Sequence, residues 1–195
     1  EAKTYYKEYL QNDGQSKDFT PYVCSLDSKP ARQDTGVVSA LFASYAFTGG
    51  AHGGLVTFAR NYDAKIGNVL TMKDLGEGVS TLAIDNVVKF VDAIQNDGDA
   101  FFYDKVTADD ESVQSMLETG CFYLSKDGLV LIDGEYLPQP YAAGIVEFTT
   151  SYDDLKGKLK EEYALTGGST SCVGSGSIYT LDKDGKLVSI KTDYD

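Results

Sequence analysis

Two runs of hydrophobic residues, separated by a glycine-rich stretch, dominate the first third of the chain. The run Val37–Phe47 is too continuous for a strand with one face in water, so it predicts a central β-strand, and Leu55–Tyr62 predicts a second strand. Residues 48–54 hold four glycines, which permit positive φ angles, and we therefore expect a β-hairpin connection there. After a turn over residues 63–68, Val69–Thr71 is expected to return as a short strand, which gives a meander.

Helical spacing of hydrophobic residues is most regular from Val79 to Ile94. It predicts a helix with Ser80 as its N-cap and Gly98 near its C-terminal end. A second helical face is expected within residues 2–10, where the apolar positions are Tyr5, Tyr6, Tyr9 and Leu10.

Two further helices are predicted from capping patterns. Thr107 with Asp110 resembles a capping box that opens a short helix ending near Gly120. Ser151 with Asp154 is expected to cap another helix. The apolar residues of these helices are Val113, Met116 and Leu117 in the first, and Leu155, Leu159 and Tyr163 in the second.

Short hydrophobic runs in the second half of the chain predict further strands. Cys121–Leu124 and Leu129–Ile132 are joined through Lys126-Asp127-Gly128, and an Asp-Gly pair accepts the positive φ angles of a tight hairpin turn. Gly144–Thr150 predicts one more strand. The class is therefore α+β, with an antiparallel β-sheet of meander and hairpins packed against one or more α-helices.

The last thirty residues differ in composition from the rest. Residues 167–177 are rich in glycine and serine and are a candidate linker, followed by a hairpin over residues 178–181 and 187–190. We expect a single α+β domain over residues 1–165, with residues 166–195 as a Gly/Ser-rich segment plus a C-terminal hairpin. Whether this hairpin pairs with the main sheet stays open.

Charge and aromatic content limit the classes of function. Against 17 basic residues stand 30 acidic ones, a net charge of −13, which repels phosphate backbones and attracts cationic partners. Nucleic-acid binding is therefore not expected. Fourteen tyrosines and nine phenylalanines require a core or a contact surface, so the chain is expected to fold.

No apolar run approaches the roughly 20 residues that span a bilayer, so any membrane attachment is expected only through a segment absent from this chain. Glu1 is not an initiator methionine, and we expect the printed sequence to begin after a removed signal, a lipoprotein anchor or a tag. Three cysteines, Cys24, Cys121 and Cys172, are compatible with one disulfide and one free thiol, without fixing the pairing.

The only histidine, His52, lies in the glycine-rich turn beside Gly49 and Gly50. Its ring could contact a ligand, so these three residues are ligand-binding candidates. The alternative is structural: the ring hydrogen-bonds nearby backbone and fixes the reversal. The turn lacks the Lys-Ser/Thr of a phosphate-binding loop.

No catalytic residues, metal ligands or cofactor are predicted. A serine or cysteine nucleophile ordinarily needs a base, and His52 is the only imidazole available. The adjacent carboxylates Asp109–Glu111 and Asp153–Asp154 are typical of helix N-termini, where negative charge is favourable. Asp182-Lys183-Asp184-Gly185 lacks the remaining ligands of a calcium loop and predicts a hairpin turn.

Tyr136 and Tyr141 flank a stiff proline-containing segment and are the remaining ligand-binding candidates. Exposed tyrosines on such a segment suit carbohydrate or protein contacts at a low entropy cost. The alternative is a buried crossover that packs against the sheet.

Two separated blocks of sequence resemble a known family. The first block comprises residues 45–53, 61–63, 66–67, 70–71 and 73–75, and the second comprises residues 122–124, 127–129, 140–144 and 147–148. In this order they resemble the extracellular domain of unknown function that is shared by the lysozyme-sensing anti-sigma factor RsiV and the peptidoglycan deacetylase PdaC. The resemblance covers about residues 22–155, and residues 131–139 depart from the more aromatic stretch usual in the family.

The resemblance implies an envelope-facing module with an antiparallel sheet packed against helices. The family's members attach this domain to different parts, and neither the inhibitory segment of an anti-sigma factor nor a metal-dependent deacetylase domain is present in these residues. From the resemblance we expect an extracytoplasmic location, whether secreted, periplasmic, or anchored by membrane segment or lipid on the outer side.

The expected function is a non-catalytic binding or sensor module that recognises a protein, with a lysozyme-like protein as one candidate, or a cell-wall glycan. One alternative is a cell-wall hydrolase or deacetylase accessory, or another enzyme fragment that works through carboxylates. Another alternative is a structural domain of envelope assembly that pairs through an edge strand.

Overall fold

The computed structural model describes most of the chain. It covers residues 3, 4, 7, 22–98, 101–102, 104–133, 137, 144–174 and 176–192, with side chains up to residue 188. The predicted helical face formed by Tyr5, Tyr6, Tyr9 and Leu10 lies outside the described residues, and so do Tyr136 and Tyr141.

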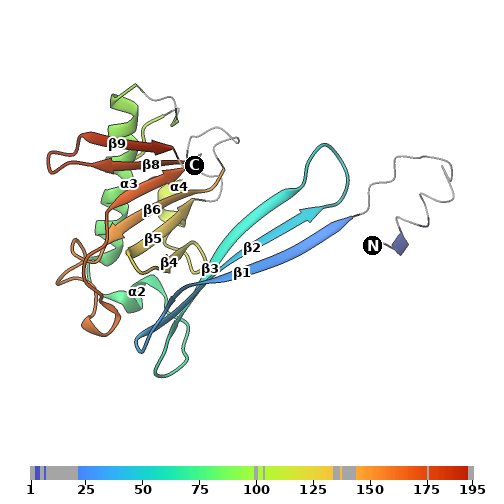
Figure 1. Ribbon diagram of the computed structural model, residues 1–195, viewed down its shortest axis with the longest axis horizontal. Coiled ribbons are helices and arrows are strands. Elements are labelled where there is room, and N and C mark those ends of the chain that lie inside the picture. Colours follow the sequence, from blue (N-terminus) through green and yellow to red (C-terminus); the bar gives the residue numbers. More distant parts are fainter. Residues whose placement is uncertain are drawn as a thin grey trace. The chain divides into compact units, whose positions relative to one another are not determined.

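Two antiparallel sheets and three α-helices make up the described fold, which confirms the α+β class (Figure 1). Each sheet follows the sequence order of its strands, as a meander does. The first sheet contains β1 (Val23–Gln33), β2 (Val37–Phe47) and β3 (Gly54–Asp63). The second contains β4 (Phe122–Leu124), β5 (Gly128–Asp133), β6 (Val146–Ser151), β7 (Ser171–Gly174), β8 (Ser177–Leu181) and β9 (Leu187–Thr192). The helices are α2 (Met72–Leu75), α3 (Val79–Asn96) and α4 (Glu111–Ser115), and a 3-10 turn, η2, spans Glu161–Tyr163.

The main core lies between α3 and the six-stranded sheet, which α3 contacts at β6 and β8 (Figure 1). The inner face of α3 is apolar at helical spacing, and Val87, Phe90, Val91 and Ile94 are fully buried. The rings of Phe90 and Phe148 lie 6.4 Å apart, so the centre of the helix packs on β6. Burial of this apolar surface is the principal force that holds the helix on the sheet.

Contacts divide the chain into two compact units. We call Glu1–Asp27 with Ala43–Val56 the small unit, and Ser28–Phe42 with Thr57–Asp195 the large unit. Each of the strands β1, β2 and β3 contributes residues to both. In its described part, the small unit therefore contains three strand segments and the connection between β2 and β3, together with residues 3, 4, 7 and 22.

The predicted hairpin of β2 and β3 is confirmed, and β2 is the middle strand of its sheet. Its burial is restricted to one end, where Val37, Ser39 and Leu41 are buried. The short strand expected at Val69–Thr71 is wrong. Only Val69 forms a bridge, to Tyr62, because Thr71 donates from its N–H and hydroxyl to Asp74 and opens α2 instead.

The helices α3 and α4 were both predicted, but each begins at a different residue from the one expected. The N-cap of α3 is Gly78 rather than Ser80, since Gly78 takes a φ of 73° that reverses the chain before Val79. Gly98, with a φ of 82°, follows the C-cap as expected. In α4 the N-cap is Asp110 rather than Thr107, although the Thr107 N–H does donate to the Asp110 carboxylate at 2.7 Å.

The helix expected after Ser151 is wrong, although its apolar residues are buried. The Ser151 hydroxyl donates to the Asp154 carboxylate at 2.9 Å and accepts from the Asp154 N–H at 3.1 Å, so the two residues do interact as a cap would. The chain then forms consecutive turns, because Gly157 adopts a φ of 78° and the Lys160 N–H donates to the Leu75 carbonyl. Only the short η2 is helical before β7.

The linker interpretation of residues 167–177 is also wrong. Ser171–Gly174 forms β7, which pairs with both β6 and β8, and Cys172 is fully buried. The C-terminal hairpin of β8 and β9 therefore joins the six-stranded sheet. At the confirmed β4–β5 hairpin, Gly128 has no positive φ; it is needed because a Cβ would lie 2.0 Å from the Thr150 carbonyl of β6.

Candidate functional site

Three of the predicted site residues lie together in the small unit. Gly49 and Gly50 have φ angles of 98° and 97°, so the connection of β2 to β3 uses the backbone freedom expected of it. His52 is exposed, and its Nδ1 lies 3.1 Å from the Gly53 carbonyl oxygen. This contact agrees with the structural role considered for the ring, and a ligand-binding role stays a prediction.

An aromatic residue that the sequence did not single out accompanies this turn. Gly53 lies so close to Tyr45 of β2 that an added Cβ would be 2.4 Å from the tyrosine ring. The ring is 36% exposed. The small unit therefore presents Tyr45 as well as His52, and the only hint in the sequence was the glycine at position 53.

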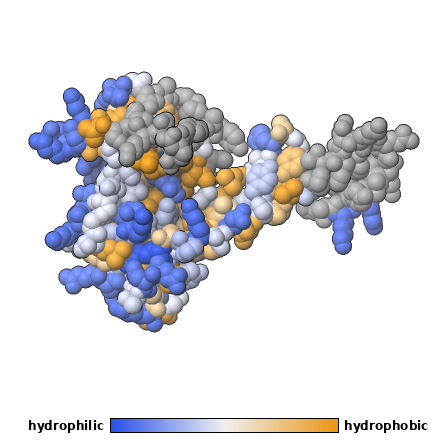
Figure 2. Space-filling model, in the orientation of Figure 1, coloured by the Kyte–Doolittle hydropathy of each residue, from blue (hydrophilic) through white to orange (hydrophobic). Residues whose placement is uncertain are grey.

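Exposed aliphatic side chains are the main feature of the strands in the small unit. Val23 and Leu26 of β1 are 45% and 63% exposed, and Leu55 and Val56 of β3 are 50% and 61% exposed. Successive residues of a strand point to opposite faces, so apolar side chains stand on both faces of this sheet. Figure 2 shows hydrophobic surface along these strands. We call Val23, Leu26, Tyr45, Leu55 and Val56 the exposed apolar set.

The same strand segments carry almost no charge. Of residues 23–27, 43–47 and 54–56, only Asp27 is charged. Both β1 and β3 are edge strands of their sheet. Edge strands that stay monomeric are usually protected by charges, prolines or bulges. In these segments, the Asp27 carboxylate is the only charge that could protect an edge.

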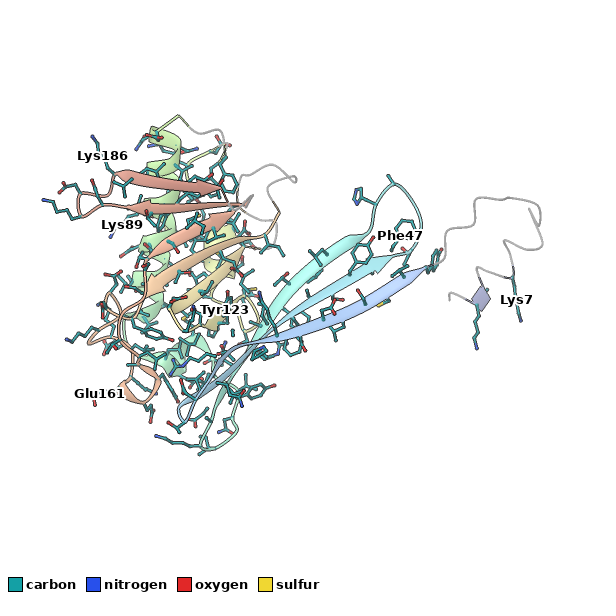
Figure 3. All side chains as sticks on the ribbon, in the orientation of Figure 1. Lys7, Phe47, Lys89, Tyr123, Glu161 and Lys186 are labelled. Carbon is teal, nitrogen blue, oxygen red and sulfur yellow. The ribbon has the colours of Figure 1, made fainter. Side chains whose placement is uncertain are left out.

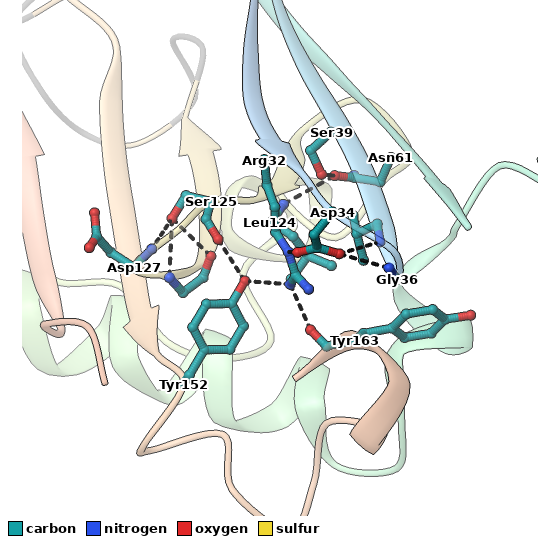
Figure 4. Close-up of polar contacts among 12 residues, drawn as sticks. Arg32, Asp34, Gly36, Ser39, Asn61, Leu124, Ser125, Asp127, Tyr152 and Tyr163 are labelled. Carbon is teal, nitrogen blue, oxygen red and sulfur yellow. Dashed lines mark hydrogen bonds and ion pairs between the residues drawn. The ribbon is translucent and has the colours of Figure 1, made fainter. Parts of the chain in front are cut away.

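In the large unit, a buried arginine organises polar side chains from distant parts of the chain (Figure 4). The Arg32 guanidinium donates to the Asp34 carboxylate at 2.6 Å, to the Tyr152 hydroxyl at 2.8 Å and to the Tyr163 carbonyl at 2.6 Å. The Tyr152 hydroxyl in turn donates to the Ser125 carbonyl at 2.6 Å. Each buried group has a partner, as stability requires.

The pKa values in this network follow from its contacts. Burial opposes ionisation of Asp34, but hydrogen bonds from Arg32 and from the Val37 and Gly36 amides outweigh it and lower the pKa. Burial raises the pKa of Tyr152, against the opposing charge of Arg32. These groups are held in fixed charge states that support the fold.

A second carboxylate, Asp63, is fixed in the same way. Its pKa is lowered by the hydrogen bond from the Lys65 amide, and also by those of Tyr163 and Ile66. The Tyr163 hydroxyl donates to Asp63 at 2.9 Å, and burial together with this bond raises its pKa to about 12.

Asn61 connects β3 to the edge of the six-stranded sheet. Its amide donates to the Phe122 carbonyl at 2.9 Å, and its side-chain oxygen accepts from the Leu124 N–H at 3.1 Å and from the Ser39 hydroxyl at 2.6 Å. One side chain thus satisfies a backbone donor and a backbone acceptor of β4. Asn61 belonged to the family resemblance, but nothing in the sequence indicated this contact.

The three cysteines form no disulfide bond with one another. Cys24, Cys121 and Cys172 are free thiols, and burial raises the pKa of Cys172 well above its usual value. Across the described ranges, no three His, Cys, Asp or Glu side chains gather closely enough to hold a metal ion. None of the helices in those ranges combines the length and apolarity that a bilayer crossing demands.

Comparison with protein-family models finds no match, and comparison with curated proteins finds none either. Solved structures do match. A DUF3298 family protein from Pseudomonas aeruginosa PAO1 is 21% identical with a TM-score of 0.54, over 83% of this chain and 71% of that one. A DUF3298 family member from Bacteroides fragilis NCTC 9343 is 22% identical with a TM-score of 0.54, over 82% of this chain and 62% of that one, which is less than two thirds of its length. DUF3298 is the RsiV/PdaC-type domain, so the chain shares its fold with structures of the family that its sequence resembles.

Proposed function

We propose that this chain is a non-catalytic, extracytoplasmic binding module that takes a protein partner against the strands of the small unit. The observation that carries the proposal is the exposed apolar set, which stands on both faces of a nearly uncharged sheet. Exposed apolar side chains on strands with unprotected edges are typical of sites that receive another protein. An extended segment of the partner can add to such an edge through main-chain hydrogen bonds.

The charge of the chain favours a basic partner. A net charge of −13 attracts a cationic protein over a distance and accelerates the encounter, while apolar contacts supply affinity once the two meet. By the family resemblance, a lysozyme-like protein is one such partner. Its binding should weaken as salt rises, because ions screen the long-range attraction.

A non-catalytic role is supported by the use that the large unit makes of its buried polar groups. Arg32, Asp34, Asp63, Tyr152 and Tyr163 are held in one another's contacts or in those of the backbone. Groups that transfer protons to a substrate need a free position toward it. In this network, the polar atoms are instead occupied by hydrogen bonds within the protein.

The test is a titration of the chain with a lysozyme at low and at moderate salt, using variants that leave the net charge unchanged. Leu26→Thr with Val56→Thr removes two members of the exposed apolar set, and Val188→Thr alters an exposed valine of β9, 59% exposed, in the large unit. We expect the double variant to bind about tenfold more weakly, because it loses roughly 1–2 kcal/mol of apolar contact, and Val188→Thr to bind as the parent does.

Two results would contradict the proposal. Equal weakening by Val188→Thr and by the double variant would mean that the small unit is not the binding surface. Absence of binding at both salt concentrations would remove a lysozyme-like partner. The glycan alternative would then be tested by retention on insoluble cell-wall glycan.

A further inference from the structure

A groove lined by both charged and apolar residues lies in the large unit, between α3 and the turn that joins β8 to β9. Its volume is about 680 Å³, within the range of small-molecule sites. Three parts of the chain line it: one face of α3, the segments around Asp154 and Thr170, and the turn at residues 181–185. All of these parts belong to the large unit, so the groove is separate from the exposed apolar set of the small unit.

The helix side of the groove presents an ammonium group. Leu82, Asn86 and Lys89 are spaced by four and three residues, so they share one face of α3. Asn86 is 8% exposed and its amide donates to the Thr149 carbonyl and the Thr150 hydroxyl, each at 3.2 Å, which fixes this face. The Lys89 ammonium has no ion-pair partner among the described side chains.

The turn on the other side presents a carboxylate. One oxygen of Asp182 accepts hydrogen bonds from the Asp184 N–H at 2.8 Å and the Lys186 N–H at 2.9 Å, so its side chain is held in place. The Lys183 ammonium lies 3.9 Å from the Asp184 carboxylate, and both are well exposed. Those two charges offset each other, which leaves Asp182 as the remaining charge among the turn residues that line the groove. Lys186, at the end of the turn, is not among the lining residues. Lys89 and the turn are drawn in Figure 3, where Lys89 and Lys186 are labelled.

Between the two walls, the groove is lined by groups that form hydrogen bonds. Asp154 accepts from the hydroxyls of Ser151 and Thr170, so its carboxylate is also fixed. The hydroxyl of Thr170 and the amide of Asn86 add polar atoms, and Leu82 and Leu181 add apolar surface. A ligand here would meet a cation on one side and anions on the other.

We propose that this groove binds a small zwitterionic ligand, an amino acid or a short peptide, with its carboxylate toward Lys89 and its ammonium toward Asp182. A purely anionic ligand would be repelled by a chain of net charge −13, and a purely cationic one would leave Lys89 opposed to it. A zwitterion can pair with the Lys89 ammonium and with the Asp182 carboxylate at the same time. The inference is independent of protein binding by the small unit.

The experiment measures binding of trialanine to the whole chain, by calorimetry or by chemical-shift titration. Each terminal charge is removed in turn, with N-acetyl-trialanine and with trialanine amide. We expect each capped form to bind about threefold to fivefold more weakly than trialanine, the effect of one partly exposed ion pair. Alanine, dialanine and tetraalanine extend the series and distinguish a free amino acid from a peptide as the preferred source.

Variants assign each end of the ligand. Lys89→Met should abolish the difference between trialanine and its amide, while keeping the effect of acetylation. Asp182→Asn keeps an oxygen for the two backbone N–H groups and should abolish the effect of acetylation alone. Lys105→Met is the matched control, because Lys105 is an exposed lysine that pairs with Asp92 outside the groove.

Three results would overturn the proposal. The first is that no member of the alanine series binds saturably in the millimolar range. The second is that capped and uncapped peptides bind equally. The third is that Lys105→Met changes the discrimination as much as Lys89→Met does. Loss of lysozyme binding by the small-unit variants, with peptide binding unchanged, would show that the two sites are separate.

Discussion

The two units use the same residue types in opposite ways. Leu131 in the six-stranded sheet is 1% exposed, whereas Leu26 in β1 is 63% exposed. Both are leucines on β-strands, yet only the first contributes apolar burial to folding. The large unit therefore accounts for stability, and the small unit keeps apolar side chains that folding does not use.

The largest expected effect separates the two units directly. Leu131→Ala should lower the free energy of unfolding by about 2–5 kcal/mol, because it leaves a cavity in the core. Leu26→Ala should change it by less than about 0.5 kcal/mol. Chemical denaturation measures both. Similar losses from the two variants would mean that Leu26 is covered in solution, and would remove it from the exposed apolar set.

A smaller effect is expected from the buried arginine of the large unit. Arg32→Met should cost about 2–4 kcal/mol, since it leaves the Asp34 carboxylate, the Tyr152 hydroxyl and the Tyr163 carbonyl without their donor. The side chain of Asp34 is 32% exposed, so water offsets part of this loss. The control is Lys105→Met, which breaks a surface pair and should cost at most about 0.5 kcal/mol. Equal costs would show that the arginine network does not stabilise the large unit.

The pH dependence of stability should also arise from the large unit. The pKa of Tyr163 is raised to about 12 in the folded chain, against about 10 when unfolded, so its contribution is complete below about pH 10 and is lost as the pH rises toward 12. Asp34 and Asp63 have lowered pKa values in the folded chain. Their contribution to stability is therefore complete above about pH 4 and is lost as the pH falls below it.

Tyr163→Phe checks the alkaline half of this argument. Denaturation followed from pH 8 to 12, a range set by the tyrosine pKa of about 10, should show a shallower loss of stability in the variant. Some loss should stay, because burial raises the pKa of Tyr152 and Tyr123 as well. An unchanged slope would mean that Tyr163 does not titrate differently in the folded chain.

The sequence predicted elements with a strong local period and missed those set by distant contacts. The spacing from Val79 to Ile94 predicted α3 because one helical face alone can supply that pattern. Leu155, Leu159 and Tyr163, the apolar residues of the predicted helix, are buried, but Gly157 turns the chain where that helix was predicted. Spacing indicates which side chains are buried more reliably than the backbone conformation that buries them.

The candidate sites were less predictable for the same reason. Arg32 meets Tyr152 and Tyr163 across 120 and 131 residues, a separation that leaves no local pattern in the sequence. Leu26 lies in β1, a strand that the hydrophobic pattern did not predict. Val56 could not be told from a core residue, because a β-strand with apolar side chains looks the same whether or not another layer covers it. By contrast, the glycine turn around Gly49 and Gly50 was predicted, since positive φ angles have a direct sequence signal.

The smallest expected effect lies in the small unit, where alanine substitutions at two glycines of the same turn should act through different physical causes. Gly50→Ala places a side chain at a φ of 97° with no atom within 4 Å, so it should cost roughly 1 kcal/mol of local backbone strain. Gly53→Ala has no such φ, but its Cβ would lie 2.4 Å from the end of the Tyr45 ring, which can move aside. We therefore expect almost no change in stability from Gly53→Ala, and a shift of the Tyr45 ring signals in NMR spectra that Gly50→Ala does not produce. Unshifted Tyr45 signals would mean that the ring does not lie against Gly53 in solution.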